Sequence, residues 1–375
     1  MKILLITEFF PTGKDLRFSG GVEARTFFVA KHLAKRHSIT VITSRVKGSA
    51  KNERMFGFKI LRVGKVREYA STGGSLIGRI RFIQDAISIG KKQPADIVEG
   101  TNFVSHFISK QIASYQKIPV IFWYPDVWIG SWVQNIGIIG IFGEILERVN
   151  LILGAGAYIV ISKQTENKLK KFVKNKISVI YCGIDENEFK VKAQKFRVPT
   201  IISVSRLAKY KNIKTLILAF AYLTTRIKKL NLIIVGTGPQ KDSLIKLTKT
   251  LNLEGKVKFY SYLPRRKLIK LYKSSHIFSL PSQVEGFGIA TIEAAVSGLP
   301  YVNSNIEIQR EVTQNSKGGF LVNLNEPLIF AEKIQDLLTD KYLYQNKASE
   351  ANTLAKSYNW ERIARQTEAV WRSVK

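Results

Sequence analysis

Short apolar segments alternate with amphipathic helical patterns along nearly the whole 375-residue chain, and this alternation restricts the fold more than any other sequence feature. The N-terminal part begins with the apolar run KILLITEFF, ended by Pro11, and continues with VEARTFFVAKHLAKR and ITVITS. Apolar residues recur at helical spacing in the second of these segments, whereas the third is short and β-branched. Strands that alternate with helices predict an α/β fold with a parallel sheet covered on both faces.

The alternation runs in two rounds, separated close to residue 190 by the polar, proline-containing stretch VKAQKFRVPT. A chain of this length accommodates two domains, each with a core of its own. We therefore predict two doubly wound, Rossmann-like domains, residues 1–190 and 191–357, facing across a cleft. A ligand is expected outside the carboxyl ends of the strands.

The charge and composition of the chain indicate which partners it can bind and exclude several kinds of site. The chain has 59 Lys and Arg against 28 Asp and Glu, a net charge of +31, which favours nucleic acid, an acidic membrane surface or a phosphorylated substrate as the partner. The single cysteine, Cys182, excludes an intramolecular disulfide and a cysteine-based zinc site. The histidines lack zinc-hydrolase spacing, and there is no Walker-type or Asp-x-Asp motif, so we predict no bound metal and no cofactor.

The segment IFSLPSQVEGFGIATIEAAVSGLP carries Glu285 and Glu293 with seven residues between them. Gly286, Phe287 and Gly288 disfavour a helix, so Glu285 is predicted on a loop and Glu293 in an early turn of the helix that follows. Amides at a helix start can bind phosphate oxygens, and a carboxylate there can accept hydrogen bonds from the paired hydroxyls of a ribose. Taken alone, this spacing is more common in an ordinary loop and helix that have no function.

A second candidate site follows the apolar run TIISVS, where Arg206 and Lys211 lie in the next loop. Arginine supplies a bidentate fork and lysine a compact charge, which together suit two linked phosphates. The alternative is a solvated basic loop. Gly236 ends the next strand, NLIIVG, where a glycine marks either a phosphate cradle or, more commonly, a tight turn.

The N-terminal half offers weaker candidates. Gly20 and Gly21 directly precede a helical pattern, where they either present amides to a phosphate or form a turn. Asp126 follows an apolar strand and is surrounded in sequence by the aromatic residues Trp123, Tyr124, Trp128 and Trp132. Such rings suit the apolar face of a sugar, although a partly buried core cluster is the commoner explanation.

Taken in order, these segments resemble the retaining glycosyltransferases of family 4, which have the two-domain GT-B fold. The similarity covers nearly the full chain, through SGGVEARTFFVAKHL, YCGIDENEF, SRLAKYKNI, IVGTGP, LPRRKLIKLYKSSHIFSLPSQVEGFGIATIEAAVSGLP and YNWERIARQTEAVW. Glu285 and Glu293 match the family's E-x7-E motif. The resemblance also implies that the C-terminal helix, about residues 358–375, returns to the N-terminal domain.

The resemblance implies roles for the candidate residues. Arg206 and Lys211 would bind the donor diphosphate, near the turn at Gly236, and Glu293 would hold the ribose. Glu285, Gly286, Phe287 and Gly288 would face the transferred sugar and its phosphate, while Gly20 and Gly21 would reach the diphosphate from the acceptor domain. The family needs no protein nucleophile, so Glu285 is not assigned that role. Family members often carry His-Asp where this chain has Pro125 and Asp126, so a contact of Asp126 with acceptor or sugar is a hypothesis.

We therefore predict an enzyme that moves a hexosyl group from a UDP- or GDP-sugar to a hydroxyl of a lipid-linked or cell-surface glycan. It would act in the cytoplasm, peripherally on the inner face of the cell membrane. Candidate contacts with an anionic membrane are the basic amphipathic runs LIGRIRFIQDAISIGKK and RRKLIKLYK and the apolar stretch 128–146. Each basic run fits equally an ordinary helix with a charged face.

Three alternatives stay open on the sequence. The first is a soluble transferase that makes a small glycoside. The second is a basic nucleic-acid-binding protein, which the charge favours but for which no binding module is recognisable, so we predict no nucleic-acid partner. The third is a noncatalytic scaffold of the same fold, which the presence of Glu285, Glu293, Arg206 and Lys211 argues against.

Overall fold

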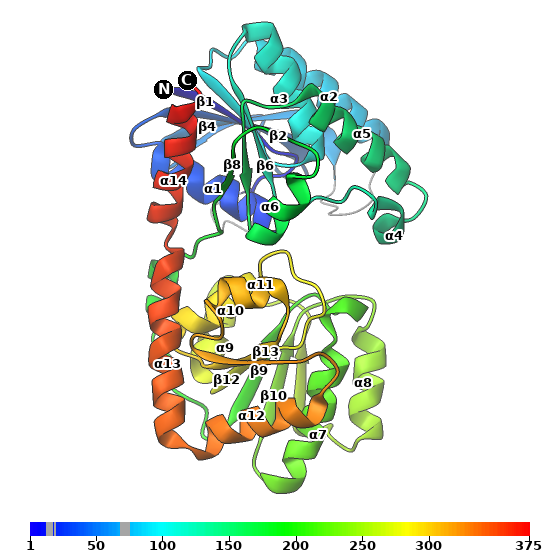
Figure 1. The fold of residues 1–375 in the computed structure, drawn as a ribbon, viewed down its shortest axis with the longest axis vertical. Coiled ribbons are helices and arrows are strands. Elements are labelled where there is room, and N and C mark those ends of the chain that lie inside the picture. Colours follow the sequence, from blue (N-terminus) through cyan, green and yellow to red (C-terminus); the bar gives the residue numbers. More distant parts are fainter. Residues whose placement is uncertain (13–17, 19, 68–75) are drawn as a thin grey trace. The chain divides into compact units, whose positions relative to one another are not determined.

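The structure is a computed structural model that describes all residues except 13–17, 19 and 68–75. The chain forms two compact units, which Figure 1 shows: unit 1 is Met1–Gly183 with Trp360–Lys375, and unit 2 is Ile184–Asn359. The division falls before the polar stretch near residue 190, because residues 184–190 pack on unit 2. Ile184 forms a parallel bridge with Asn359, and Arg265 Nε donates a hydrogen bond to Glu188 Oε2 at 3.0 Å.

Unit 1 is built on an eight-stranded sheet in which every neighbouring pair is parallel except β3 with β4. In order across the sheet, the strands are β3 (Asn52–Met55), β4 (Phe58–Arg67), β2 (Ser38–Val46), β1 (Lys2–Ile6), β5 (Ile97–Gly100), β6 (Val120–Tyr124), β7 (Ala157–Val160) and β8 (Ile177–Val179). The strand order reverses between β1 and β5, which makes this the switch point of a doubly wound sheet. The sequence did not predict the β3–β4 hairpin.

Helices cover both faces of this sheet (Figure 1). They are α1 (Gly21–Leu33), α2 (Leu76–Lys91), α3 (Phe103–Gln116), α4 (Trp132–Ile136), α5 (Gly140–Leu153), α6 (Lys163–Leu169) and α14 (Trp360–Ser373). The C-terminal helix α14 packs against α1, so the chain returns to unit 1 as the resemblance implied. The central strands β1, β5, β6 and β7 are buried apart from Lys2 and carry mostly apolar side chains, as expected of a sheet covered on both faces.

Unit 2 contains a six-stranded, wholly parallel sheet. In order across the sheet, the strands are β11 (Val257–Tyr260), β10 (Asn231–Val235), β9 (Thr200–Val204), β12 (Ile277–Leu280), β13 (Tyr301–Ser304) and β14 (Gly319–Val322). The order reverses between β9 and β12. The loops after these two strands are therefore where a ligand is expected.

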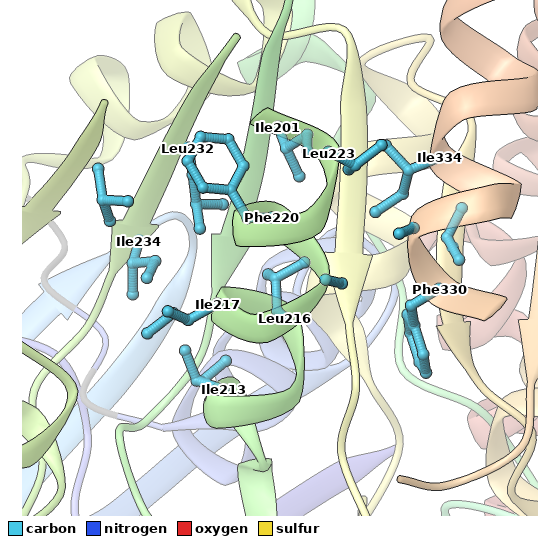
Figure 2. Packing of buried hydrophobic residues seen from close by; sticks show 14 of the residues in the cluster. Ile201, Ile213, Leu216, Ile217, Phe220, Leu223, Leu232, Ile234, Phe330 and Ile334 are labelled. Atoms are coloured by element: carbon cyan, nitrogen blue, oxygen red, sulfur yellow. The ribbon is translucent and has the colours of Figure 1, made fainter. Parts of the chain in front are cut away.

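The helical elements of unit 2 are η1 (Glu186–Lys190), η2 (Lys209–Lys211), α7 (Ile213–Arg226), α8 (Lys241–Thr250), α9 (Arg265–Ser274), α10 (Ile289–Val296), α11 (Glu307–Val312), α12 (Pro327–Thr339), α13 (Lys341–Ala355) and η3 (Lys356–Tyr358). Figure 2 shows how the larger core forms: Phe220 and Leu223 of α7 meet Ile201 of β9 and Leu232 of β10, with Ile334 of α12 alongside. A smaller core on α9 and α10 includes Tyr272 and Ala294. Both cores fix the two strands whose loops carry the candidate site.

Candidate functional site

The loops after β9 and β12 of unit 2 carry most of the predicted donor-binding residues. Arg206 is the second residue after β9, and Glu285 lies in the loop between β12 and α10. The hydroxyl oxygens of Ser205 and Ser282 in the same loops are buried and have no hydrogen-bond partner in the described part of the chain. The switch point of unit 2 therefore gathers a cation, a carboxylate and two unused hydroxyls at one edge of the sheet.

Lys211 and Glu285 are brought together, although 74 positions separate them in sequence. Lys211 Nζ lies 2.6 Å from Glu285 Oε1, and the two side chains are only 13% and 8% exposed. This ion pair joins the loop after β9 to the loop after β12. Because Glu285 neutralises Lys211, the pair holds the loops in place and contributes little net charge of its own.

Arg206 differs from Lys211 in having no internal partner. Its side chain is exposed, and among the residues that the structure describes it makes no ion pair or hydrogen bond. A guanidinium that is held at the switch point and has all its donors free can bind an anionic ligand in a bidentate manner. Arg206 is therefore the group in this loop best prepared for a phosphate.

Glu293 is buried on α10 and is already engaged by two side chains. Arg265 Nη1 donates to Glu293 Oε1, and the Tyr272 hydroxyl donates to Glu293 Oε2 at 3.1 Å. A carboxylate has about four acceptor positions, so both oxygens keep capacity for hydroxyls of a ligand. Sequence reasoning missed Arg265 and Tyr272; they lie in RRKLIKLYK, and their seven-residue spacing puts them on one side of a helix.

The three residues after Glu285 divide into different structural roles. A Cβ atom on Gly286 would meet nothing within 4 Å, so the backbone here is open to a ligand. Gly288 has φ +82°, and a Cβ there would lie 2.6 Å from Gln309 Nε2, so its glycine is required for the start of α10. The ring of Phe287 is buried against Tyr358, 5.7 Å between centroids, and therefore packs within unit 2.

Close packing requires glycine at position 236. Its φ is +152°, and a Cβ would lie 1.8 Å from the carbonyl oxygen of Ser205. The turn after β10 thus approaches the loop after β9 too closely for any side chain. The geometry agrees with the tight-turn interpretation, and contact of Gly236 with a donor stays a prediction.

In unit 1, Gly20 and Gly21 lie at the start of α1. Gly20 is the N-cap residue, in an extended conformation, and both glycines are exposed. A Cβ on Gly21 would meet no atom of the described residues within 4 Å. The backbone at the start of a 13-residue helix is therefore accessible, although a contact of this loop with a diphosphate stays a prediction.

Asp126 lies just beyond the carboxyl end of β6 and is half-buried. Its Oδ1 accepts hydrogen bonds from the Val127 amide at 2.8 Å and from Lys168 Nζ at 2.7 Å. The aromatic residues around it are mostly core: Trp123, Tyr124 and Trp132 are buried. The core-cluster interpretation therefore holds for these three rings, and Asp126 itself is paired with a cation rather than free.

Glu147 of α5 is an acidic group that the sequence reasoning missed. Its carboxylate accepts hydrogen bonds from the Trp132 indole at 2.6 Å and from the Trp128 amide at 3.3 Å, and so fixes the segment after Asp126. Burial raises the pKa of Glu147 to about 7, against the opposing effect of these two hydrogen bonds. The sequence signal that could have identified Glu147 is its position as a charged residue in an otherwise mainly apolar helix.

This raised pKa predicts a specific pH dependence of stability. Between the ordinary pKa of 4.5 and about 7, folded Glu147 holds a proton that the unfolded chain releases, so its stabilising contribution is lost as the pH rises. The wild type should lose up to roughly 1.4 kcal/mol per pH unit relative to Glu147→Gln in this window. Urea denaturation of both proteins at pH 5, 6, 7 and 8 measures the difference, and parallel pH profiles would contradict it.

His106 is not a catalytic candidate. It is fully buried on α3, its Nε2 lies 2.9 Å from the carbonyl oxygen of Trp123, and it stacks on Phe122 at 4.5 Å. Burial lowers the pKa of His106 to about 3, so the ring is neutral. Across residues 1–12, 18, 20–67 and 76–375, no group of three His, Cys, Asp or Glu side chains is placed to hold a metal ion.

The candidate membrane contacts lie in different structural settings. RRKLIKLYK forms α9, whose Leu268, Ile269 and Tyr272 pack into unit 2, so its apolar side covers the sheet. LIGRIRFIQDAISIGKK forms α2, which buries Phe82 and leaves Ile77 exposed. Exposed apolar side chains occur on α5 and just before it, at Ile138, Ile139, Ile141, Phe142, Ile145 and Ile152, and we call them the α5 apolar surface. None of the helices in the described parts of the chain has the length and apolar character to cross a membrane.

Comparison with known proteins places this geometry in context. The family model described as Glycosyltransferase Family 4 matches residues 19–188, and the model described as Glycosyl transferases group 1 matches residues 184–365. An uncharacterised glycosyltransferase of Methanocaldococcus jannaschii is 24% identical over 398 aligned residues, covering 99% of this chain and 98% of that protein. Several relatives with a named activity match over about half of their own length.

Solved structures show the same fold. Sucrose-phosphate synthase from Thermosynechococcus elongatus has a TM-score of 0.82 and 20% identity, over 100% of this chain and 98% of that one. Anabaena HepE in complex with UDP-glucose has a TM-score of 0.74 and 19% identity, over the full length of both chains. These similarities confirm the predicted architecture of two Rossmann-like domains.

Proposed function

Because this chain belongs to the glycosyltransferases and has the GT-B fold, we propose that it is a retaining enzyme acting from a nucleotide sugar. The donor is a UDP- or GDP-hexose bound at the switch point of unit 2. The acceptor is a hydroxyl of a lipid-linked or cell-surface glycan, bound by unit 1. The observation that carries the proposal is Arg206, which makes no side-chain hydrogen bond or ion pair with the described residues and lies in the loop after β9 that also carries Lys211 of the Lys211–Glu285 pair.

Several contacts support the assignment of the donor to this edge. Arg206 has free donors for the diphosphate, and Gly286 leaves the neighbouring backbone open. Glu293 keeps acceptor capacity on both oxygens while Arg265 and Tyr272 fix its position, which suits paired ribose hydroxyls. HepE of Anabaena, which shares the fold, is described in complex with UDP-glucose.

The proposed chemistry follows from where charge develops. The bond between the anomeric carbon and the diphosphate oxygen breaks, and the bonding electrons leave with the diphosphate. The acceptor oxygen attacks from the same face and passes its proton to the departing phosphate, so the configuration is retained without a protein nucleophile. Positioned cations stabilise the leaving group most in the transition state, where its charge is largest.

Nucleotide titration tests the proposal. We expect UDP or GDP to bind with a defined stoichiometry of one per chain by isothermal titration calorimetry, and a panel of nucleotide sugars to yield transfer or hydrolysis by mass spectrometry. A single-stranded oligonucleotide of matched charge is the control for the basic surface. Binding of the oligonucleotide with a steep salt dependence and no binding of either nucleotide would favour the nucleic-acid alternative and reject the transferase.

We also propose peripheral association with the cytoplasmic face of the cell membrane through the α5 apolar surface. Ile138 is 79% exposed and Ile152 84% exposed, which is unusual for isoleucine in a folded domain. The net charge of +31 supports an anionic lipid surface as the partner, since apolar insertion and charge attraction act together.

Flotation with liposomes checks the membrane proposal. The wild type should float with vesicles containing anionic lipid at low salt, and Phe142→Glu should weaken binding roughly tenfold or more because it places a charge in the apolar surface. Tyr342→Glu, at a position 81% exposed on α13, controls for the added charge. No flotation of the wild type at low salt would remove membrane association and leave the transferase proposal intact.

A further inference from the structure

An arginine cluster lies at the carboxyl edge of the sheet in unit 1, apart from the residues considered so far. Arg67 is the last residue of β4, Arg79 lies in the first turn of α2, and both point to Glu8, two residues beyond β1. Glu8 Oε1 accepts a hydrogen bond from Arg67 Nη2 at 2.8 Å and another from Arg79 Nε at 3.0 Å. β1 borders the switch point of this sheet, where open α/β sheets bind their ligands.

The charges of this cluster do not balance within the described part of the chain. There, one carboxylate faces two guanidinium groups, and a single oxygen of Glu8 pairs with both. The backbone of Glu8 is also fixed, because its carbonyl oxygen accepts a hydrogen bond from the Ser44 amide at 3.1 Å. The position of Glu8 therefore does not depend on the two arginines alone. A partly buried pair of cations with one anion leaves a net positive site that a further anion would stabilise.

Unused donors identify where that anion would bind. Arg67 is only 7% exposed, yet its Nη1 is buried and has no hydrogen-bond partner among the residues that the structure describes. The side chain of Arg79 is 20% exposed. Its hydrogen bond to the described residues is donated by Nε, so none of them engages its two terminal nitrogens, which can donate to a ligand. Arg45 is a third arginine with an unused donor. It lies between Ser44 and Val46, where the register of β2 shifts, and its Nε is buried with no hydrogen-bond partner among the described residues. Buried polar atoms are normally satisfied, so each such atom requires an explanation.

We infer that Arg67 and Arg79 form an anion-binding subsite in unit 1 and that it takes a phosphate group carried by the acceptor. Guanidinium forks match the geometry of phosphate oxygens, and a partly buried setting strengthens each charge-assisted hydrogen bond. Glu8 aligns both arginines and keeps the subsite from holding an uncompensated pair of cations when it is empty. This inference rests on the proposed transferase function only for its statement that the phosphate belongs to the acceptor.

The test is a titration with inorganic phosphate at constant ionic strength, followed by calorimetry on four proteins. The wild type should bind phosphate, and Arg79→Gln should weaken that binding about tenfold, since a hydrogen bond to a charged group is lost. Arg81→Gln is the matched control: it is two residues away on the same helix, 58% exposed, and paired with Asp85. Arg206→Gln reports separately on phosphate bound in unit 2.

The outcomes are distinguishable from those of the donor titration. Identical phosphate curves for Arg79→Gln and Arg81→Gln, or no phosphate binding by the wild type, would overturn the subsite while UDP or GDP binding stood unaffected. Tenfold weaker phosphate binding by Arg79→Gln with unchanged nucleotide binding supports it. Phosphate monoesters of simple alcohols should then compete with inorganic phosphate for the wild type, whereas the parent alcohols should not; competition by the alcohols would overturn the assignment to phosphate.

Discussion

Replacement of Arg206 by alanine is expected to lower kcat for sugar transfer by roughly 10²- to 10³-fold while leaving the thermal stability of the protein unchanged. The expected loss is large because Arg206 is the cation at the unit 2 switch point whose donors are all available to a leaving diphosphate. Stability should not change, since the side chain is exposed and makes no ion pair or hydrogen bond within the described residues. Transfer rates by mass spectrometry and the melting temperature together measure the two effects.

Lys209→Ala provides the control, because Lys209 is an exposed cation three positions further along the same loop. It should keep transfer within about twofold of the wild type if the position of the charge, rather than the total charge of the loop, decides the rate. Arg206→Lys should recover only part of the activity, since lysine keeps the charge and loses the bidentate fork. Equal losses for Arg206→Ala and Lys209→Ala would contradict the role of Arg206.

Lys211→Ala is expected to behave differently from Arg206→Ala. Its removal leaves the Glu285 carboxylate, 8% exposed, without its partner at 2.6 Å. Breaking a buried pair by removing one member is destabilising, so this variant should lose both activity and stability. Comparing the two variants therefore distinguishes Arg206, which we expect to contribute to ligand binding alone, from Lys211, which we expect to contribute to stability as well.

The architecture was predictable because buried parallel strands leave a strong sequence signal. Segments such as ITVITS and NLIIVG are short and rich in Ile and Val, and helical patterns separate them. The hairpin of β3 and β4 was missed because β3, NERM, is a polar edge strand whose side chains alternate only between exposed and half-buried. An edge strand needs no apolar face, and so carries little of the periodicity on which the prediction depends.

The candidate site was predictable only as separate segments. Loop positions after strands and the glycines around Glu285 placed Arg206, Lys211 and Glu285 at the ends of strands. The pairing of Lys211 with Glu285 across 74 positions could not be predicted, because it depends on how β9 and β12 lie side by side in the sheet. The same reason explains why Arg265 was noted only as part of a basic run that fits either a membrane contact or an ordinary helix: nothing local indicates that Glu293 accepts its hydrogen bond.

Removal of the Glu99 carboxylate, as Glu99→Ala, is expected to lower the free energy of unfolding by about 3–5 kcal/mol. Glu99 of β5 is fully buried, where it pairs with Arg25 of α1 and accepts a hydrogen bond from the indole of Trp371 at 2.6 Å. Arg25 also lies over the ring of Trp123, 5.1 Å from its centroid. One carboxylate therefore joins α1, α14 and the centre of the sheet, and its loss leaves a buried guanidinium uncompensated.

Urea denaturation followed by tryptophan fluorescence measures this effect. Arg365→Ala is the matched control on α14, because it removes an ion pair with Glu361 in which both side chains are more than half exposed; it should cost well under 1 kcal/mol. The double variant Arg25→Met with Glu99→Leu should be more stable than Glu99→Ala, since no buried charge is then left unpaired. All of these groups lie in unit 1, so nucleotide binding by unit 2 should persist in Glu99→Ala at low temperature. If Glu99→Ala lowers the free energy of unfolding no more than Arg365→Ala does, the buried Glu99 carboxylate does not stabilise the packing of α14 on the sheet.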